Sequence, residues 1–496
     1  MPASSFPTGL ISASIFEMRY LRRLLITLLI PGSMAVSAQD CILKSRAADY
    51  AGLKMPVYII ENPINRRHHI IDTLQFNGDG DFRLQLELKK ITVVYLDLGR
   101  YTGYIYAEPG YEYTLFLPPY IKRTHQNDIN PFYRQAEVLL NVRGCKRIGS
   151  DISLNPDLER NNLILQFDTT FNRLNEDIIF QRQARLPVNA DSLIKQIENN
   201  LSSPEDPLLN RYRRYRYGLM KINEGQTGLG EISRQYLWDP IPRTDEPAYM
   251  DLFNAMFKEF LLYYARTEDG KSIPAIVNRR HSLSELRKVI GNHPAIFSDT
   301  IADLVILKGL FEQYYDSYFI KDAILIILDS LKHNPSIESY GTLAGELYDG
   351  FSRLMIGNKP PEFSLRDQNG KLRSPDDFSG KYVYLYFCTP DNYSCMSEYP
   401  FLKSYYEKHM DYLEIVTIMI SESFDAMVTF MKNNHYDWTA LYYNDQSDIL
   451  EKYNVRFFPT AFLLAPDGTL VQSPATLPSE GFQQQLFRIM RSRGEI

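Results

Sequence analysis

The sequence predicts three consecutive regions: a small antiparallel β-sandwich, an all-helical middle region and a mixed α/β domain at the C-terminal end. Short strands separated by turns lie between residues 55 and 117, helical patterns follow to about residue 353, and strands then alternate with helices. The expected borders are 39–125, 126–355 and 356–496. A chain of 496 residues, 44% of them apolar, is long enough for several cores, because single cores rarely exceed about 250 to 300 residues.

Residues 1–38 are predicted to be a signal peptide that is cleaved after Ala38. A basic region, an apolar stretch and a small-residue cleavage site follow one another at residues 19–23, 24–30 and 36–38. Residues 1–17 fit neither a signal nor a domain, so translation from Met18 is a hypothesis. The apolar stretch is well short of the ~20 residues of a membrane-spanning helix. We therefore expect an exported protein of the periplasm or cell envelope, with no membrane-spanning segment after signal cleavage.

The sandwich prediction depends on six short strands with turns between them. Period-two alternation is clearest in 82–88, and the other strands are expected at 57–60, 69–71, 92–96, 104–106 and 113–117. In the middle region, Asn155, Pro156 and Asp157 form a helix start. Further helices are expected from Asp299, over 320–331 and over 340–355.

The charge balance argues against nucleic acid as a partner. The formal net charge is −6, which gives no general attraction to a phosphate backbone. Residues 211–217 alternate arginine with tyrosine, a composition that can bind nucleic acid or anionic glycans. For an acidic exported protein we favour a helix with its tyrosines packed inward and its arginines directed outward. No metal or nucleotide motif is present, and no cofactor is expected.

In the C-terminal region, a continuous apolar and aromatic run at 381–387 is typical of a strand covered on both faces. Glu398, Phe401, Leu402 and Tyr405 then fall at helical spacing. Cys395 therefore belongs to the first turn of a helix, where free backbone N–H groups and the helix dipole can favour a thiolate. Strands at 413–420 and 460–464, a hairpin to 470–471 and helices at 424–431 and 482–490 complete the pattern.

The chain has four cysteines, at positions 41, 145, 388 and 395. An exported protein can form disulfides, and the clustering suggests Cys41 with Cys145 and Cys388 with Cys395. Four unpaired thiols remain the alternative, because sequence cannot establish the geometry that a disulfide needs.

Several motifs in the last 135 or so residues resemble exported thioredoxin-like proteins of the TlpA and ResA kind, within the AhpC/TSA-redoxin superfamily. They lie at 361–371, 378–381, 387–400 and 453–460, in the order found in that family. The resemblance implies a thioredoxin-like C-terminal domain. It also implies that Pro459 is a cis-proline whose loop, including Phe458, faces the thiols and binds an extended peptide. Cys395 would be the second cysteine of the family's motif, and Glu398 the acidic residue near the active site.

The sequence departs from the family at the first cysteine, which falls on Asn392 and leaves a degenerate motif, Asn392-Tyr393-Ser394-Cys395. A carboxamide forms no thiolate, and the ordinary dithiol cycle needs one thiol to attack and another to resolve. Cys388 replaces an aromatic residue that packs under this turn in the family, so we predict that Cys388 approaches Cys395. Two small buried residues filling that space are the alternative. Glu398 is the candidate proton acceptor for Cys395, with surface solvation as its alternative.

These residues leave three classes of function open. The first is a thiol-disulfide redox role in the envelope, using Cys395, Cys388 and Glu398 on protein thiols. The second is a non-catalytic binding module, whose groove at Asn392, Phe458 and Pro459 holds an extended segment of another envelope protein. The third is an architectural envelope protein, in which the sandwich and the helices carry the function and the last domain is a retained scaffold. A peroxiredoxin-type peroxidase ranks lower, because its spacing would put the nucleophile at Ser397. Whether the protein is an enzyme is left open.

Overall fold

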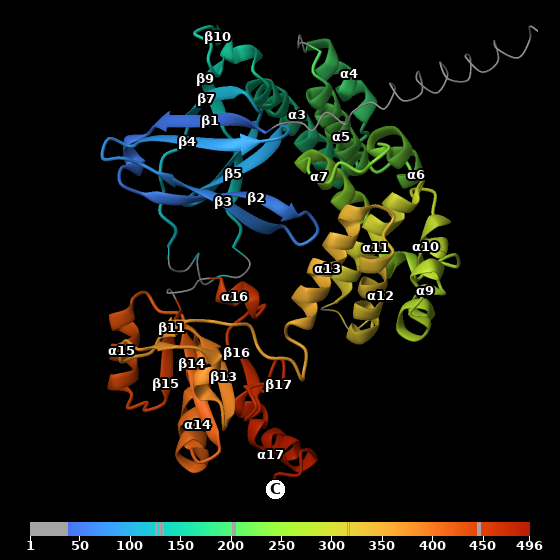
Figure 1. Ribbon diagram of the computed structural model, residues 1–496. Coiled ribbons are helices and arrows are strands. Elements are labelled where there is room, and N and C mark those ends of the chain that lie inside the picture. Colours follow the sequence, from blue (N-terminus) through green and yellow to red (C-terminus); the bar gives the residue numbers. More distant parts are fainter. Residues whose placement is uncertain are drawn as a thin grey trace, which may run out of the picture.

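The computed structural model describes residues 38–496 apart from 125–126, 128–129, 131–132, 201–204, 315, 317 and 444–447. The predicted signal peptide, except Ala38, lies outside the described residues. Figure 1 shows the β-sandwich beside a group of helices, with the C-terminal α/β domain below them. These regions agree with the predicted fold class, while the exact domain borders stay a prediction.

The N-terminal domain is a sandwich of two five-stranded sheets. The first has the order β10-β9-β7-β1-β4 and the second β3-β2-β5-β6-β8. Their inward-facing side chains form one core, and β4 alternates buried and exposed residues along its length. The first sheet contains β1 (Gln39–Arg46), β4 (Asp81–Leu88), β7 (Tyr111–Phe116), β9 (Asn141–Arg147) and β10 (Ser153–Leu154); the second contains β2 (Lys54–Asn62), β3 (Arg67–Gln75), β5 (Thr92–Leu98), β6 (Tyr101–Ala107) and β8 (Ala136–Leu139).

Three features of the sandwich differ from prediction. Strand β1 was not expected, and β8 to β10 lie in a stretch that was expected to be helical, so the prediction of helix is wrong there. Two neighbouring pairs, β1 with β7 and β6 with β8, are parallel rather than antiparallel. Strands β8 and β10 carry hardly any buried side chains; β8 is held by backbone pairing with β6, and β10 by pairing with the preceding strand β9. Such pairing leaves little periodicity in the local sequence.

The predicted disulfide between Cys41 and Cys145 is absent, and both residues are buried free thiols. Leu43 of β1 and Cys145 of β9 are both register partners of Tyr113, so β7 runs between the two cysteine-bearing strands. Two strand spacings amount to about 10 Å, which exceeds the ~7 Å between Cα atoms that a disulfide tolerates. That pairing is therefore wrong for this fold.

The middle region packs its helices around one large core. Helix α11 is buried on nearly all sides, whereas the others present one apolar face. The predicted helices near residues 299, 320 and 340 are present as α11, α12 and α13. The helices are α3 (Arg160–Gln183), α4 (Ala190–Asn200), α5 (Pro207–Glu224), α6 (Leu229–Ile232), α7 (Pro247–Met256), α8 (Phe260–Tyr264), α9 (Ile273–Ala275), α10 (Leu283–Gly291), α11 (Asp299–Gln313), α12 (Lys321–His333) and α13 (Glu338–Ser352).

Helix α3 joins the sandwich through two adjacent buried asparagines. The side chain of Asn161 accepts a hydrogen bond from the backbone N–H of Tyr106 and donates one to its carbonyl. Asn162 makes the same two bonds to Val142. Each carboxamide thus replaces a neighbouring strand for one residue of β6 or β9, which satisfies backbone groups that would be costly to bury unpaired.

The arginine-tyrosine stretch lies within α5. Tyr212, Tyr215 and Tyr217 are buried, as expected. The arginines lie against acidic side chains rather than pointing freely outward: Arg211 pairs with Glu246, and Arg214 with Asp239. These ion pairs give the stretch a structural role in joining neighbouring helices.

The C-terminal domain is built on a mixed sheet of order β15-β14-β13-β16-β17. Strands β13, β14 and β15 are parallel to one another, β16 runs antiparallel to β13, and β17 runs antiparallel to β16. Separate cores cover the two faces of the sheet. The elements are β11 (Leu365–Arg366), β12 (Leu372–Arg373), β13 (Tyr382–Cys388), α14 (Tyr393–His409), β14 (Leu413–Met419), α15 (Phe424–Asn433), β15 (Thr439–Tyr442), α16 (Ile449–Lys452), β16 (Thr460–Leu464), β17 (Leu470–Gln472) and α17 (Phe482–Ser492).

This order confirms the predicted hairpin, central strand and strand-helix alternation, and adds β15 and α16, which were not expected. After α13 the chain passes along the edge of the sheet, where Gly357 and Asn358 exchange backbone hydrogen bonds with Leu470 of β17. Among the described helices, none combines the length and apolar character needed to cross a bilayer.

Candidate functional site

The candidate site lies where β13 ends and α14 begins. All residues of β13 are buried, and the strand occupies the middle of the sheet. Asn392 caps the helix, because its side-chain oxygen accepts a hydrogen bond from the backbone N–H of Cys395 at 3.2 Å. Asparagine is favoured at this position since it satisfies an N–H group that the helix leaves free. The turn therefore fixes Cys395 in the first turn of α14.

The structure brings together the two cysteines that were predicted to approach each other. Cys388 ends β13, and Cys395 lies across the turn from it in the same core. Both are free thiols with 0% of their surface exposed. The Cys388 side chain hydrogen-bonds to that of Cys395. The pair is therefore a contacting dithiol enclosed by the protein.

The environment separates the acidities of the two thiols. The hydrogen bond from Cys388 lowers the pKa of Cys395, and the backbone N–H of Thr389 lowers it further. Burial and the negative charge of Glu398 oppose that effect without reversing it. Burial raises the pKa of Cys388 well above its usual value, and the neighbouring Cys395 adds to this. Cys395 is therefore the more acidic thiol of the pair.

Two tyrosines that were not predicted as site residues contact the pair. The Tyr399 hydroxyl lies 2.9 Å from the sulfur of Cys388, and the Tyr386 hydroxyl donates to the backbone carbonyl of Cys395 at 3.1 Å. The Tyr399 ring packs against Tyr436 and Trp438, with centroids 4.9 and 5.8 Å apart. Helical spacing was the available signal for Tyr399, since residues four apart share a helix face and Tyr399 follows Cys395 by four.

Asn392 also contacts the loop of Pro459. The peptide bond between Phe458 and Pro459 is cis, as the resemblance implied. The side-chain nitrogen of Asn392 lies 3.5 Å from the carbonyl oxygen of Phe458. We call this two-sided contact, from the Cys395 N–H through Asn392 to the Phe458 carbonyl, the Asn392 bridge. It occupies the space between the start of α14 and the cis-proline loop, so the three predicted binding residues lie together.

Glu398 is buried and its carboxylate is held on the side of Ser479. One oxygen accepts from the Ser479 backbone N–H at 2.8 Å, and the other from its hydroxyl at 2.5 Å. The negative charge still acts on Cys395, whose pKa it raises. No contact joins Glu398 directly to a thiol among those described, so its role as proton acceptor stays a prediction.

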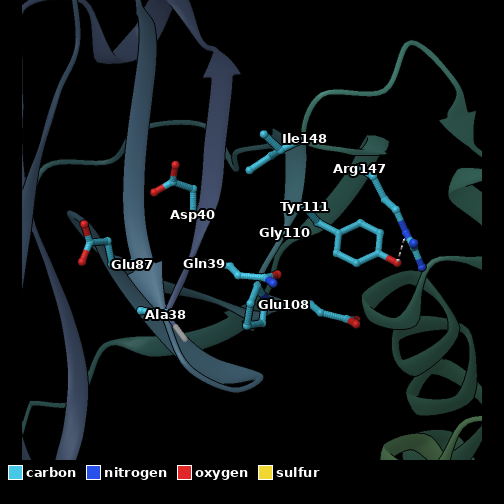
Figure 2. A pocket seen from close by; sticks show the side chains of 10 residues that line it. Ala38, Gln39, Asp40, Glu87, Glu108, Gly110, Tyr111, Arg147 and Ile148 are labelled. Carbon is cyan, nitrogen blue, oxygen red and sulfur yellow. Dashed lines mark hydrogen bonds between the residues drawn. The ribbon is translucent and has the colours of Figure 1, made fainter. Parts of the chain in front are cut away.

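The described part of the chain holds no group of three or more His, Cys, Asp or Glu side chains placed to bind a metal. A surface hollow of about 850 Å³ lies in the sandwich, on a different domain from Cys388 and Cys395. Figure 2 shows acidic side chains around it, including Asp40, Glu87 and Glu108, with the Tyr111 hydroxyl bonded to Arg147. Neither Cys388 nor Cys395 lines this hollow, and the sequence did not predict it.

Comparisons with known proteins agree on the C-terminal domain. A family model described as thioredoxin-like matches residues 380–470. The thiol-disulfide oxidoreductase ResA of Bacillus subtilis is 31% identical over 160 residues, which is 31% of this chain and 82% of that protein. The thioredoxin-like protein YneN of the same organism is 27% identical over 136 residues, covering 26% of this chain and 79% of that protein.

Among solved structures, the thioredoxin domain of a thiol-disulfide oxidoreductase from Bacteroides vulgatus aligns with 27% of this chain and 98% of its own length. The identity is 22% and the TM-score 0.25.

The central strand, the cysteine in the first turn of the following helix and the facing cis-proline define a thioredoxin-like domain. The chain belongs to the thioredoxin-like redoxin family, and ResA-type thiol-disulfide oxidoreductases are among its relatives. The family model lies within the C-terminal domain, and the match to ResA covers 31% of the chain.

Proposed function

We propose that this protein is a thiol-disulfide redox protein of the cell envelope, in which Cys395 is the nucleophile and Cys388 its partner. The hydrogen-bonded contact between the two thiols carries the proposal. A thiolate and a protonated thiol in contact can be oxidised to one disulfide with loss of two electrons and one proton, without a cysteine at position 392. The difference in acidity assigns the attack to Cys395.

In the exchange reaction, the Cys395 thiolate attacks a disulfide of the partner protein and releases one partner thiolate. Cys388 then loses its proton and attacks the Cys395 sulfur of the mixed disulfide, which releases the second partner thiolate. Tyr399 can donate a hydrogen bond to the Cys388 sulfur while that sulfur is negative. Protein thiols are thus the proposed partners, and Glu398 is the proposed proton acceptor near Cys395.

The envelope location is proposed from the predicted signal peptide and from the likeness to ResA. It is tested by cell fractionation together with the N-terminal sequence of the mature chain. Recovery of a chain that still carries residues 1–38 from the cytoplasm would contradict it.

The redox role is tested by equilibrating the full chain in glutathione buffers, blocking free thiols and mapping the peptides. A Cys388–Cys395 disulfide is expected in the oxidised buffer. Cys388→Ser and Cys395→Ser each remove it, while Cys145→Ser is a matched control that changes a buried thiol elsewhere. Insulin reduction by the same variants measures exchange with a protein disulfide. Both thiols remaining free in oxidising buffer would contradict the proposal.

A second candidate function is favoured by the exposed aromatic residues beside the site. Tyr393 and Phe457 are 86% and 61% exposed, and each adjoins a residue of the Asn392 bridge. Such side chains can take up an extended segment of another envelope protein without any redox step. Binding of partner peptides that is equal for the wild type and for Cys395→Ser would favour this function over the redox role.

A further inference from the structure

The most informative property of the thiol pair is that no surface of either sulfur is exposed. A protein disulfide has to place one of its sulfurs in line with the attacking thiolate, with its own backbone alongside. Here the space between the start of α14 and the cis-proline loop is taken by the Asn392 bridge. Exchange with a protein therefore requires that the bridge opens first.

A small oxidant meets a lower barrier. Cys395 lies in the first turn of α14, directly behind Tyr393 and Ser394, both exposed, and beside the short turn that carries Asp391. A movement of that turn large enough for about one water molecule gives a hydroperoxide access to the sulfur, since such a gap needs only about 30 Å³. The bridge to Phe458 can stay closed during this movement.

The partner thiol is already in place for the second step. Cys388 hydrogen-bonds to Cys395, so an oxidised Cys395 has a thiol in contact and needs no unfolding of the helix to meet it. The Tyr399 hydroxyl, 2.9 Å from the Cys388 sulfur, can support the negative charge when Cys388 gives up its proton. The aromatic side chains packed on Tyr399 hold that hydroxyl in position.

We propose that the preferred oxidant of the reduced pair is a small hydroperoxide, and that exchange with proteins is the slower reaction, limited by the Asn392 bridge. The proposal rests on the proposed redox function and names the oxidant for that same site. Taken with slow exchange, it describes a peroxide-responsive thiol switch that partner proteins reset.

The chemistry balances in two steps. The Cys395 thiolate attacks the terminal oxygen of the hydroperoxide and the O–O bond breaks; that oxygen keeps its proton as the sulfenic acid of Cys395. The departing alkoxide, or hydroxide from hydrogen peroxide, takes up a proton from water and leaves as the alcohol or as water. The Cys388 sulfur then attacks the Cys395 sulfur, the S–OH bond breaks, and the departing hydroxide takes up the Cys388 proton as water. One hydroperoxide is consumed for each disulfide formed.

The test compares hydrogen peroxide with two other oxidants on the reduced full chain. Disulfide formation at Cys388–Cys395 is followed by thiol blocking and mass mapping, for the folded protein and for the same chain unfolded in urea. We expect peroxide to oxidise the folded pair about tenfold faster than the unfolded thiols, because the thiolate and its partner are both in place. Cys388→Ser is expected to accumulate a sulfenic acid at Cys395 that dimedone traps, and Cys395→Ser to form neither product.

The other oxidants separate this inference from the proposed function. Diamide, a small thiol oxidant, should form the same disulfide, and insulin should form it more slowly than peroxide does at equal concentration. If diamide forms the Cys388–Cys395 disulfide but peroxide reacts with the folded pair no faster than with the unfolded chain, the hydroperoxide inference is wrong and the redox function stands. If no oxidant forms the Cys388–Cys395 disulfide in the folded chain, the hydroperoxide inference and the proposed redox function are both wrong.

Discussion

The Asn392 bridge can be tested directly with Asn392→Ala. The substitution removes the helix cap, in which the Asn392 oxygen accepts from the Cys395 N–H at 3.2 Å, and the weaker contact of 3.5 Å to the Phe458 carbonyl. Loss of an asparagine cap costs about 1 kcal/mol. We assign nothing to the longer contact, because 3.5 Å lies outside the usual range of an N–H···O bond.

A cost of about 1 kcal/mol on the closed state raises the population of the opened turn about fivefold. When opening and closing are fast relative to the chemical reaction, labelling follows that population. Exchange of Cys395 with insulin should therefore accelerate about fivefold, whereas alkylation by iodoacetamide, a small reagent, should accelerate less. Mass mapping of quenched time points measures the rate at Cys395 separately from the other cysteines.

The matched control is Ser423→Ala. Ser423 caps α15 in the same domain through a 3.1 Å bond from the Ala426 N–H, so its loss lowers stability by a similar amount at a position away from the thiols. The control should leave the Cys395 rate unchanged. Equal acceleration in both variants, or no acceleration in Asn392→Ala, would refute the view that the bridge controls access to the pair.

Four further predictions concern other side chains of the site and of the sandwich. Tyr399→Phe removes the hydroxyl beside Cys388 and keeps the ring packing; the dithiol should lose about 1 kcal/mol relative to the disulfide, so redox titration should show a reduction potential about 20 mV more negative. Glu398→Gln removes a charge that raises the pKa of Cys395; the pH profile of Cys395 alkylation should move to lower pH, and an unchanged profile would show that the charge is screened. Because folding lowers the pKa of Cys395, ionisation of this thiol should stabilise the fold above the unfolded thiol pKa, and this stabilisation should be lost as pH falls through the folded pKa. Burial raises the pKa of Cys41 to about 12, so Cys41 should stabilise the fold below the unfolded thiol pKa and lose this effect as pH rises through the folded pKa. Urea unfolding of the wild type, Cys395→Ser and Cys41→Ser across pH measures both signs. Asn161→Ala leaves the N–H and carbonyl of Tyr106 without partners, and urea unfolding should show a loss of about 2 to 5 kcal/mol, with a smaller loss contradicting the role assigned to that side chain.

The C-terminal domain was predictable because its signals are local. A continuous buried strand, a helix that begins near Cys395 and the residues around Pro459 each carry their own pattern, and the comparisons confirm the family they indicate. The sandwich was predictable only where side chains alternate. Strand β1 lies between β4 and β7, and β8 pairs with β6, so their positions follow from partners distant in sequence. The short strands β8 and β10 bury too little to show a period.

The candidate site was likewise predictable only where its signals are local in the sequence. The sequence indicated that Cys388 and Cys395 could meet across the turn, because the strand-turn-helix order limits where each can lie. It could not show that Tyr399 contacts Cys388, or that Asn392 joins the helix start to Phe458, since both contacts depend on side-chain directions. It also gave no sign that the carboxylate of Glu398 is held by Ser479, which lies 81 positions away along the chain.

Two positions that look independent in the sequence are linked in the structure. The resemblance implies an exposed cysteine where Asn392 stands and an aromatic residue where Cys388 stands; in this chain Cys388 lies beneath the turn, in the core. Asn392 caps the helix above it and contacts the cis-proline loop. A thiol pair placed in this way keeps the acidity difference that redox chemistry needs, while the size of the reagent decides what reaches it. Access, rather than the presence of a second cysteine, is therefore the property that separates this site from an exposed dithiol.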